Sequence, residues 1–269
     1  MRRPKPKSDV AVIGGTGLED LLEQAEQIRI GTPYGLPSST FVGEIDGNSL
    51  AFLPRHGIHH SIPPHQVNYQ ANVQALHQLG VKRIIATNAV GAINTKFEPG
   101  DLVVPHDLID FTKSRRFTFY DGAPVTHVDV SQPFCPEIRR SLIGAVKRSG
   151  MKVWDRAVLV CTEGPRYETP AEIRMFERLG CDVVGMTGAP EAVLARELEI
   201  CYATVCFVSN MAAGIQKRLT ASEMAGVARK RMPIIRQILG ETIKNLPKNR
   251  SCPCAHALDD ARCRGLHDA

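Results

Sequence analysis

Residues 82–91, KRIIATNAVG, decide the fold that this sequence predicts, because they form a continuous Ile- and Ala-rich run that ends in Asn88 and Gly91. Such a run, closed by turn-forming residues, is typical of a strand buried within a parallel sheet. Four further stretches have the same character: SDVAVIGG (8–15), RAVLVCTEG (156–164), CDVVGMT (181–187) and CYATVCFVSN (201–210). We therefore predict five short buried strands.

Helical patterns separate these strands. Apolar residues recur every three to four positions in 66–80, 135–150, 169–180 and 189–199, and a long amphipathic pattern runs from about Thr220 to Leu246. This alternation predicts an α/β fold with a mainly parallel sheet, whose ligands bind at the carboxyl ends of the strands. Because 269 residues with 43% hydrophobic content carry no linker or repeat, we expect one domain over 1–269.

The charge of the chain excludes few classes of protein. The formal net charge is +5, and part of it lies in the N-terminal run MRRPKPK (1–7). A basic tail can contact nucleic acid, but we interpret this one as a solvated tail and expect no nucleic-acid partner. No apolar stretch has membrane-spanning length and no signal-peptide pattern is present, so we expect a cytoplasmic protein with no membrane partner.

The eight cysteines fall into two groups. Those in apolar surroundings are typical of inert core thiols in a reduced compartment; they are Cys135, Cys161, Cys181, Cys201 and Cys206. The C-terminal extension, 247–269, holds Cys252-Pro-Cys254 with His256, Cys263 and His267. A zinc site, a redox pair, a local disulfide and surface thiols are all compatible with this pattern, and because no second closely spaced pair is present we predict no metal.

Glycines and a hydroxyl follow the first predicted strand. Gly14, Gly15, Thr16 and Gly17 offer backbone amides and a side-chain hydroxyl that can close on an oxyanion. The full G-x-G-x-x-G spacing and the lysine of a P-loop are absent, which argues against a dinucleotide or nucleoside triphosphate site. A purely structural tight turn is the alternative.

Further polar residues stand at the ends of predicted strands. Arg55 and His56 form a pair suited to phosphate, because a guanidinium matches the oxygens of that anion. We interpret the nearby His59 and His65 as polar loop residues. One further strand end supplies Asn88 and Ala89, and a second supplies Met186 and Thr187, although Thr187 is also a candidate helix cap.

Glu168, in CTEGPRYETP, and Asn210, in CFVSNMAAG, together match a purine edge. A carboxylate only accepts hydrogen bonds, whereas a side-chain amide both donates and accepts, so the pair suits N1–H and the O6/N7 side of a 6-oxopurine. The N1 of adenine is an acceptor that would face the carboxylate, and a mismatch of this kind costs about 1–3 kcal/mol.

The motifs of the chain resemble those of the trimeric purine nucleoside phosphorylase and 5′-methylthioadenosine phosphorylase family. The resemblance rests on IGGTG, LPRHG, HQVNYQANV, FYDG, QPFCP, TEGPRYET, MTGAPEAVLARELEICYA and VSN, in that order, and leaves out only the first residues and those after about Leu246. It implies a three-layer α/β/α sandwich with a mixed, partly barrel-like central sheet. It also implies a homotrimer, or a hexamer built from two trimers.

The resemblance also implies roles for individual residues. Phosphate would be held by Thr16, Arg55, His56, Asn88, Ala89 and Thr187. Met186 would lie under the ribose and Tyr167 beside the base, while Glu168 and Asn210 contact the base edge and Met211 and Ala212 continue the pocket wall. His60, His127, Glu168 and Ala221 would border the 5′ pocket, with His127 lent to a neighbouring subunit.

These roles imply phosphorolysis of an N-glycosidic bond. Asn210 would stabilise the departing base and His56 would serve at the phosphate, which make them the candidate catalytic residues. Inorganic phosphate would be a co-substrate, and we expect no cofactor. A nucleoside hydrolase, the rival enzyme class, would attack with water and would not need this set of anion-binding residues.

We infer the base and the 5′ group of the substrate from positions at which this chain differs from the methylthioadenosine branch of the family. The methylthioadenosine branch has Asp-Tyr-Asp and a serine where this chain has Asn210-Met211-Ala212 and Glu168. We therefore predict cleavage of inosine and guanosine. S-methyl-5′-thioinosine or S-methyl-5′-thioadenosine is the alternative, because small and apolar residues near Ala221, Met224 and Ala225 permit a methylthio group.

Overall fold

A mixed sheet forms the middle of the protein in the computed structural model, which describes residues 8–15, 18, 21–45 and 47–263. The strands of this sheet, in chain order, are β1 (Val10–Gly14), β2 (Glu23–Ile28), β3 (Thr40–Ile45), β4 (Asn48–Pro54), β5 (Arg83–Ala92), β6 (Leu102–Val103), β7 (Asp107–Phe111), β8 (Val153–Trp154), β9 (Val158–Thr162), β10 (Val183–Gly185) and β11 (Cys201–Met211). The five strands predicted from the sequence are confirmed as β1, β5, β9, β10 and β11.

The sheet combines parallel and antiparallel pairs. Its main path runs β2-β3-β4-β1-β5-β10-β9-β7, and β11, β6 and β8 branch from β5. The hairpins β2–β3 and β3–β4 are antiparallel, as are β10–β5 and β11–β6, whereas the remaining pairs are parallel. The mixed sheet expected of the phosphorylase-type fold is thus confirmed, and it remains open rather than closing into a barrel.

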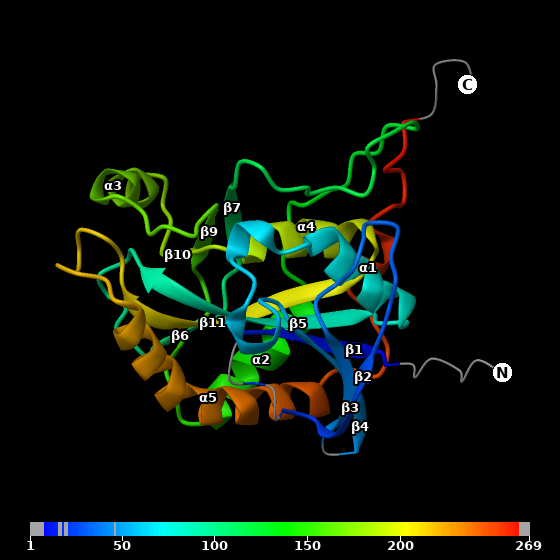
Figure 1. Ribbon diagram of the computed structural model, residues 1–269, viewed down its shortest axis with the longest axis horizontal. Coiled ribbons are helices and arrows are strands. Elements are labelled where there is room, and N and C mark those ends of the chain that lie inside the picture. The colour runs from blue at the N-terminus through cyan, green and yellow to red at the C-terminus, as the bar shows by residue number, and fades with distance from the viewer. Residues whose placement is uncertain (1–7, 16–17, 19–20, 46, 264–269) are drawn as a thin grey trace.

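Helices cover both faces of this sheet (Figure 1). On one face α4 packs against β11 and α1 packs on α4, while on the other α2 and α5 pack against each other and against β11. Among the described residues, no helix combines the length and apolarity needed to cross a membrane. The helices are α1 (Tyr69–Gln78), α2 (Pro136–Arg148), α3 (Pro170–Arg178), α4 (Gly188–Glu197) and α5 (Ala221–Lys244), with the short 3₁₀ turns η2 (Ile58–His60), η3 (Pro64–Gln66) and η4 (Pro253–His256).

Strand β5 is paired along its whole length on one edge and only in part on the other. β11 pairs with residues 83–92, whereas β1 pairs with 83–86 and β10 with 91–92. Residues 87–90 therefore have no strand partner on that second edge within the described chain. Adjacent strands that diverge in this way leave a crevice at the carboxyl end of a sheet, where ligands of α/β proteins bind.

A β-bulge interrupts the pairing of β11 with β5. Val208 pairs with Val90 and Asn210 with Gly91, so Ser209 is an extra residue on β11. Since side chains alternate between the two faces of a strand, one extra residue reverses which positions face a given side. Phe207 and Ser209 face the crevice before the bulge, and Asn210 and Ala212 face it afterwards.

Hydrogen bonds fasten the described part of the C-terminal extension, 247–263, to the body of the protein. Arg83 Nη2 donates to the carbonyl of Pro247 (2.8 Å), and Ser251 donates to Glu137 through its backbone N–H and its hydroxyl (2.7 and 2.6 Å). Cys252 and Cys254 are buried, whereas Cys263 is exposed. The surface-thiol interpretation therefore fits Cys263 and is wrong for Cys252 and Cys254.

Candidate active site

A cavity of about 1300 Å³ opens where β1 and β10 diverge from β5. It exceeds the roughly 300–1,000 Å³ usual for a small-molecule site, so it has room for two small substrates. Most residues singled out from the sequence line it: Arg55, His56, His60, Asn88, Ala89, Tyr167, Glu168, Met186, Thr187, Asn210, Ala212 and Ala221. Thr16 lies outside the described residues, although its neighbour Gly15 lines the cavity.

Met211 and His127 do not line the cavity of this chain. Met211 follows the bulge, which turns its neighbours Asn210 and Ala212 toward the cavity instead. His127 is exposed in a loop, and its backbone N–H donates to the carbonyl of Ala261 (2.8 Å). Its contribution to a neighbouring subunit stays a prediction.

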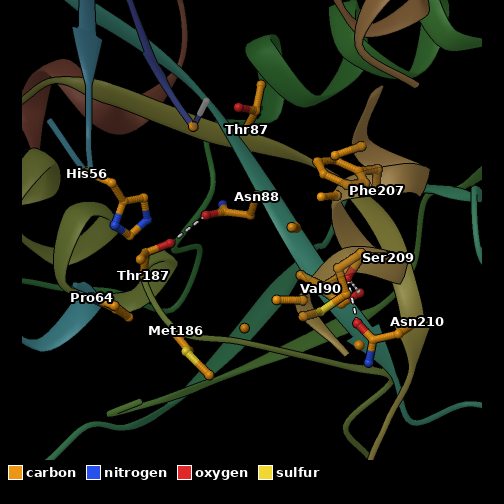
Figure 2. Close-up of a pocket in the computed structure, with 18 of the residues that line it drawn as sticks. His56, Pro64, Thr87, Asn88, Val90, Met186, Thr187, Phe207, Ser209 and Asn210 are labelled. Atoms are coloured by element: carbon orange, nitrogen blue, oxygen red, sulfur yellow. Dashed lines mark hydrogen bonds between the residues drawn. The ribbon is translucent and has the colours of Figure 1, made fainter. Parts of the chain in front are cut away.

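Asn88 and Thr187 form one end of the cavity together with His56 (Figure 2). The hydroxyl of Thr187 donates to Asn88 Oδ1 (2.6 Å), and Asn88 Nδ2 donates to the hydroxyl of Thr204 (2.7 Å). Thr204 in turn donates to the carbonyl of Ala86 (3.1 Å). This chain of hydrogen bonds fixes both cavity-lining side chains to the central strands.

Helix α4 begins directly behind Thr187. Thr187 is its N-cap residue and makes no side-chain cap hydrogen bond, while its hydroxyl donates to Asn88. The first N–H groups of a helix have no partner within the helix and carry its positive dipole end. An anion beside Thr187 and Asn88 would therefore meet a helix terminus suited to phosphate.

His56 presents a neutral imidazole at this end of the cavity. Burial lowers the pKa of His56 to about 4, and the nearby positive charge of Arg55 adds to the effect. Nδ1 lies 2.8 Å from the carbonyl of Ile62, so it carries the proton in the neutral ring and Nε2 is left as an acceptor. A neutral His56 can accept a hydrogen bond from a protonated phosphate oxygen.

Arg55 forms a buried ion pair with Glu191, which the sequence analysis did not single out. Arg55 Nε and Nη2 donate to the Glu191 carboxylate (2.5 and 2.9 Å), and Nη1 donates to the carbonyl of Thr87 (3.0 Å). The hydroxyl of Tyr202 also donates to Glu191 (2.7 Å). The guanidinium fork expected to hold phosphate is thus engaged with Glu191, and only two of its five N–H hydrogens remain.

Arg55 keeps its positive charge although it is buried. Burial by itself lowers the pKa of Arg55, but the Glu191 carboxylate outweighs burial and the net pKa is raised. Glu191 lies in the first turn of α4, where the helix dipole favours a carboxylate. The pair is neutral overall, and it holds the Arg55 guanidinium, with its two remaining N–H hydrogens, beside the cavity.

Asn210 lies at the opposite end of the cavity from His56 (Figure 2). The hydroxyl of Ser209 lies 2.6 Å from Asn210 Oδ1, and Asn210 Nδ2 donates to the carbonyl of Met211 (2.9 Å). One Nδ2 hydrogen and one Oδ1 lone pair are left for a ligand. Gly91 permits this placement, since a Cβ there would lie 3.2 Å from Asn210 Nδ2.

Glu168 offers a second polar group in the same cavity. Its Oε1 accepts a hydrogen bond from the hydroxyl of Thr162 (2.7 Å), which leaves Oε2 without a hydrogen-bond donor among the described residues. The carboxylate is half-buried. Glu168 and Asn210, 42 positions apart in the sequence, therefore present an acceptor and a donor–acceptor pair to one space.

Arg115 positions the backbone around Met186, and sequence reasoning did not find it. It is buried, and its guanidinium donates to the carbonyls of Met186 (2.5 Å), Thr162 (3.2 Å) and Glu163 (2.6 Å). These carbonyls belong to the two segments of backbone that lead to Thr187 and to Glu168. The basic stretch KSRR (113–116) carries no sequence signal that singles out Arg115 for this role.

Comparison with known proteins agrees with this geometry. The family model described as "Phosphorylase superfamily" matches residues 9–244. The "6-oxopurine nucleoside phosphorylase" of Pyrococcus furiosus is 49% identical over 94% of this chain and 98% of its own length. The "Probable S-methyl-5′-thioinosine phosphorylase" of Methanothermobacter thermautotrophicus is 51% identical over 94% of this chain and 89% of its own.

A solved structure shows the same likeness in three dimensions. The crystal structure of a methylthioadenosine phosphorylase from an Antarctic soil metagenomic library superposes with a TM-score of 0.89, with 34% sequence identity. The match covers 97% of this chain and 94% of that one.

Removal of Glu191 should destabilise the protein strongly. Glu191→Ala leaves the buried Arg55 charge without a partner, and we expect the free energy of unfolding to fall by about 3–5 kcal/mol. Urea denaturation measures this change. The matched control is Glu241→Ala, which breaks the exposed pair Arg148–Glu241 and should cost less than about 1 kcal/mol. Equal losses in the two variants would contradict a buried, structurally required pair.

His56 should titrate far below an ordinary histidine. We expect NMR titration to give a pKa near 4 and nitrogen shifts that place the proton of the neutral ring on Nδ1. Because the folded pKa lies below the unfolded value of about 6.5, the unfolded state binds more protons between these values, and stability should fall as the pH drops through this window. The fall should be smaller in His56→Gln. A pKa near 6.5 would refute the buried neutral ring.

Proposed function

The chain belongs to the phosphorylase superfamily, and we propose that it cleaves 6-oxopurine nucleosides, inosine and guanosine, with inorganic phosphate to give the free base and ribose 1-phosphate. The main support for this proposal is that Glu168 and Asn210 line the same cavity. The other end of that cavity is formed by His56, Asn88 and Thr187. As a nucleoside phosphorylase the protein is a pentosyltransferase, and relatives at about half identity are named for this activity.

The polar groups left by Glu168 and Asn210 match a 6-oxopurine. Oε2 of Glu168 can accept from N1–H, while Nδ2 of Asn210 can donate to O6 and its Oδ1 can accept from a protonated N7. Val184 and Phe207 supply apolar wall for the base. The N1 of adenine is an acceptor and would leave the Glu168 carboxylate mispaired, which disfavours adenosine.

The two ends of the cavity stabilise the charges that phosphorolysis creates. Negative charge accumulates on the base as the N-glycosidic bond breaks, and Asn210 can hydrogen-bond it there. The ribosyl group becomes cationic and is captured by phosphate, which Thr187, Asn88, the α4 terminus and Arg55 would attract. His56 Nε2 would accept a hydrogen bond from the phosphate and fix its orientation. Such interactions accelerate a reaction because they strengthen toward the transition state.

The 5′ pocket admits more than one substituent. Ala221, Met224 and Ala225 of α5 line the cavity together with His60, so small and apolar side chains border this part of it. A 5′-hydroxyl and a 5′-methylthio group both suit such walls, which keeps S-methyl-5′-thioinosine as the second candidate substrate. A relative with that name is as similar to the chain as the 6-oxopurine nucleoside phosphorylase. Both names specify a 6-oxopurine base.

We extend the proposal to the assembly. A homotrimer, alone or paired into a hexamer, would bring His127 of one subunit to the cavity of another, since His127 lies in an exposed loop away from its own cavity. We further propose that the enzyme is one catalytic domain in the cytoplasm and needs no organic cofactor.

Exchange of the base-contacting amide should change the base preference. Asn210→Asp replaces the donor to O6 with an acceptor, and we expect kcat/KM for inosine to fall by about 10- to 1,000-fold while the ratio of adenosine to inosine cleavage rises. Steady-state kinetics with both nucleosides measures this. Asn249→Asp, an exposed change outside the cavity, is the control and should leave both values unchanged. An unaltered ratio in Asn210→Asp would remove Asn210 from the base site.

Loss of the Thr187 hydroxyl should weaken phosphate binding selectively. Thr187→Val keeps the shape but removes a group bonded to Asn88, and we expect the KM for phosphate to rise about 10- to 100-fold, the worth of one hydrogen bond to a charged group. The KM for inosine should change much less. Thr126→Val, a loop substitution outside the cavity, serves as control. A larger effect on inosine than on phosphate would place the anion elsewhere.

A further inference from the structure

Four cysteines from three separate parts of the chain meet in the interior. Cys135 is the residue before α2, Cys201 is the first residue of β11, and Cys252 and Cys254 come from the C-terminal extension. All four are buried, and their sulfur atoms all lie within 4.8 Å of one another. The sulfurs of Cys201 and Cys252 are 3.3 Å apart. We call this group the cysteine cluster.

The spacing of the cysteine cluster matches the coordination shell of a metal ion. Zinc binds thiolates at about 2.3 Å in a tetrahedron, whose edges are then about 3.8 Å long. A cluster in which every pair of sulfurs is close fits four ligands around one centre. Two disulfides would require only two close pairs, and all eight cysteines are unbonded in the structure.

We propose that the cysteine cluster binds one zinc ion in a closed structural site. Each thiol would release its proton to solvent and form one Zn–S bond, and zinc itself would undergo no redox change. Four cysteine ligands fill the tetrahedron and leave no position for water or substrate. The proposal departs from the prediction of no metal, which rested on the absence of a second closely spaced cysteine pair in the sequence.

The positive end of a helix dipole lies beside the cysteine cluster. Cys135 is the N-cap residue of α2, where the first N–H groups of the helix have no partner within the helix. This helix end would oppose the net negative charge of a zinc ion with four thiolates.

The cysteine cluster lies far from the cavity, so its proposed role is to hold the C-terminal extension in place and not to take part in catalysis. Cys201 and Asn210 lie nine residues apart on one strand, roughly 30 Å at the usual rise. Beyond Cys254 the extension pairs with the loop that carries His127, through bonds from Cys263 N–H to Val125 and from His127 N–H to Ala261 (2.9 and 2.8 Å). A bound zinc would therefore fasten the extension and, through it, this loop.

Metal analysis of the whole chain tests the site. Protein purified without chelators, from zinc-supplemented cells and under reducing conditions, should contain about one zinc ion per chain. The Cys254→Ser and Cys135→Ser variants should each contain at least about tenfold less zinc per chain. Cys263→Ser, exposed, and Cys206→Ser, buried outside the cluster, are matched controls and should keep it. Equal loss in the controls, or no zinc in the wild-type protein, would overturn the proposal.

A second measurement does not depend on whether the variants fold. Wild-type protein with cobalt in place of zinc should show the intense visible and thiolate charge-transfer absorption of tetrahedral Co²⁺ bound to four sulfurs. Intact-mass analysis under non-reducing conditions should find all eight thiols reduced in the metal-free chain. Disulfides that link the four cluster cysteines in freshly purified protein, or cobalt bound without thiolate bands, would overturn the proposal.

Chelation should separate the role of the cysteine cluster from that of the active site. Zinc removal should lower the melting temperature and increase proteolysis of the 247–263 segment, because the metal joins this segment to α2 and β11. Restoration of zinc should reverse both effects. A melting temperature and proteolysis pattern unaffected by complete zinc removal would contradict a structural site.

Discussion

The incomplete pairing of β5 is the constraint on which the rest of the structure depends. β11 supports this strand over 83–92, while β1 and β10 leave residues 87–90 unpaired on the other edge. Unpaired buried backbone is costly unless other groups satisfy it. Arg55 donates to the carbonyl of Thr87, and Glu191 holds Arg55 there, so one buried ion pair both maintains the opening and places N–H donors of the guanidinium beside it. The end of the cavity that we propose for phosphate follows from this arrangement.

Much of the fold was predictable because its longest elements carry clear patterns. Each of the five predicted strands and five predicted helices exists, and their alternation indicated a sheet covered by helices. The remaining strands had weaker signals. β6 and β8 have two residues each, and β2 is mostly exposed and polar, so neither length nor apolar periodicity marks them. The antiparallel pairs β10–β5 and β11–β6 join strands that are far apart in the sequence, and no local pattern specifies them.

The sequence brought Glu168, Asn210 and Thr187 forward through their side-chain chemistry and the family resemblance, and all three line the cavity. The site was not predictable where geometry decides. The bulge at Ser209 turns Asn210 and Ala212 inward and leaves Met211 out of the cavity, and strict alternation along β11 cannot reveal this. In the sequence Glu191 is an ordinary acidic residue in the first turn of a helix, and only the fold shows that it pairs with Arg55. Cys135 and Cys201 resemble core thiols until the extension brings Cys252 and Cys254 to them.

The central claim, a phosphate-dependent enzyme with a 6-oxopurine site, is tested most directly by the wild-type protein alone. Initial rates should be measured for inosine, guanosine and adenosine, each with and without inorganic phosphate. The account predicts release of hypoxanthine and guanine only when phosphate is present, with adenosine cleaved at least about tenfold more slowly, the ratio expected from one mispaired buried polar group. Cleavage of inosine at the same rate without phosphate, or of adenosine as fast as inosine, would contradict it.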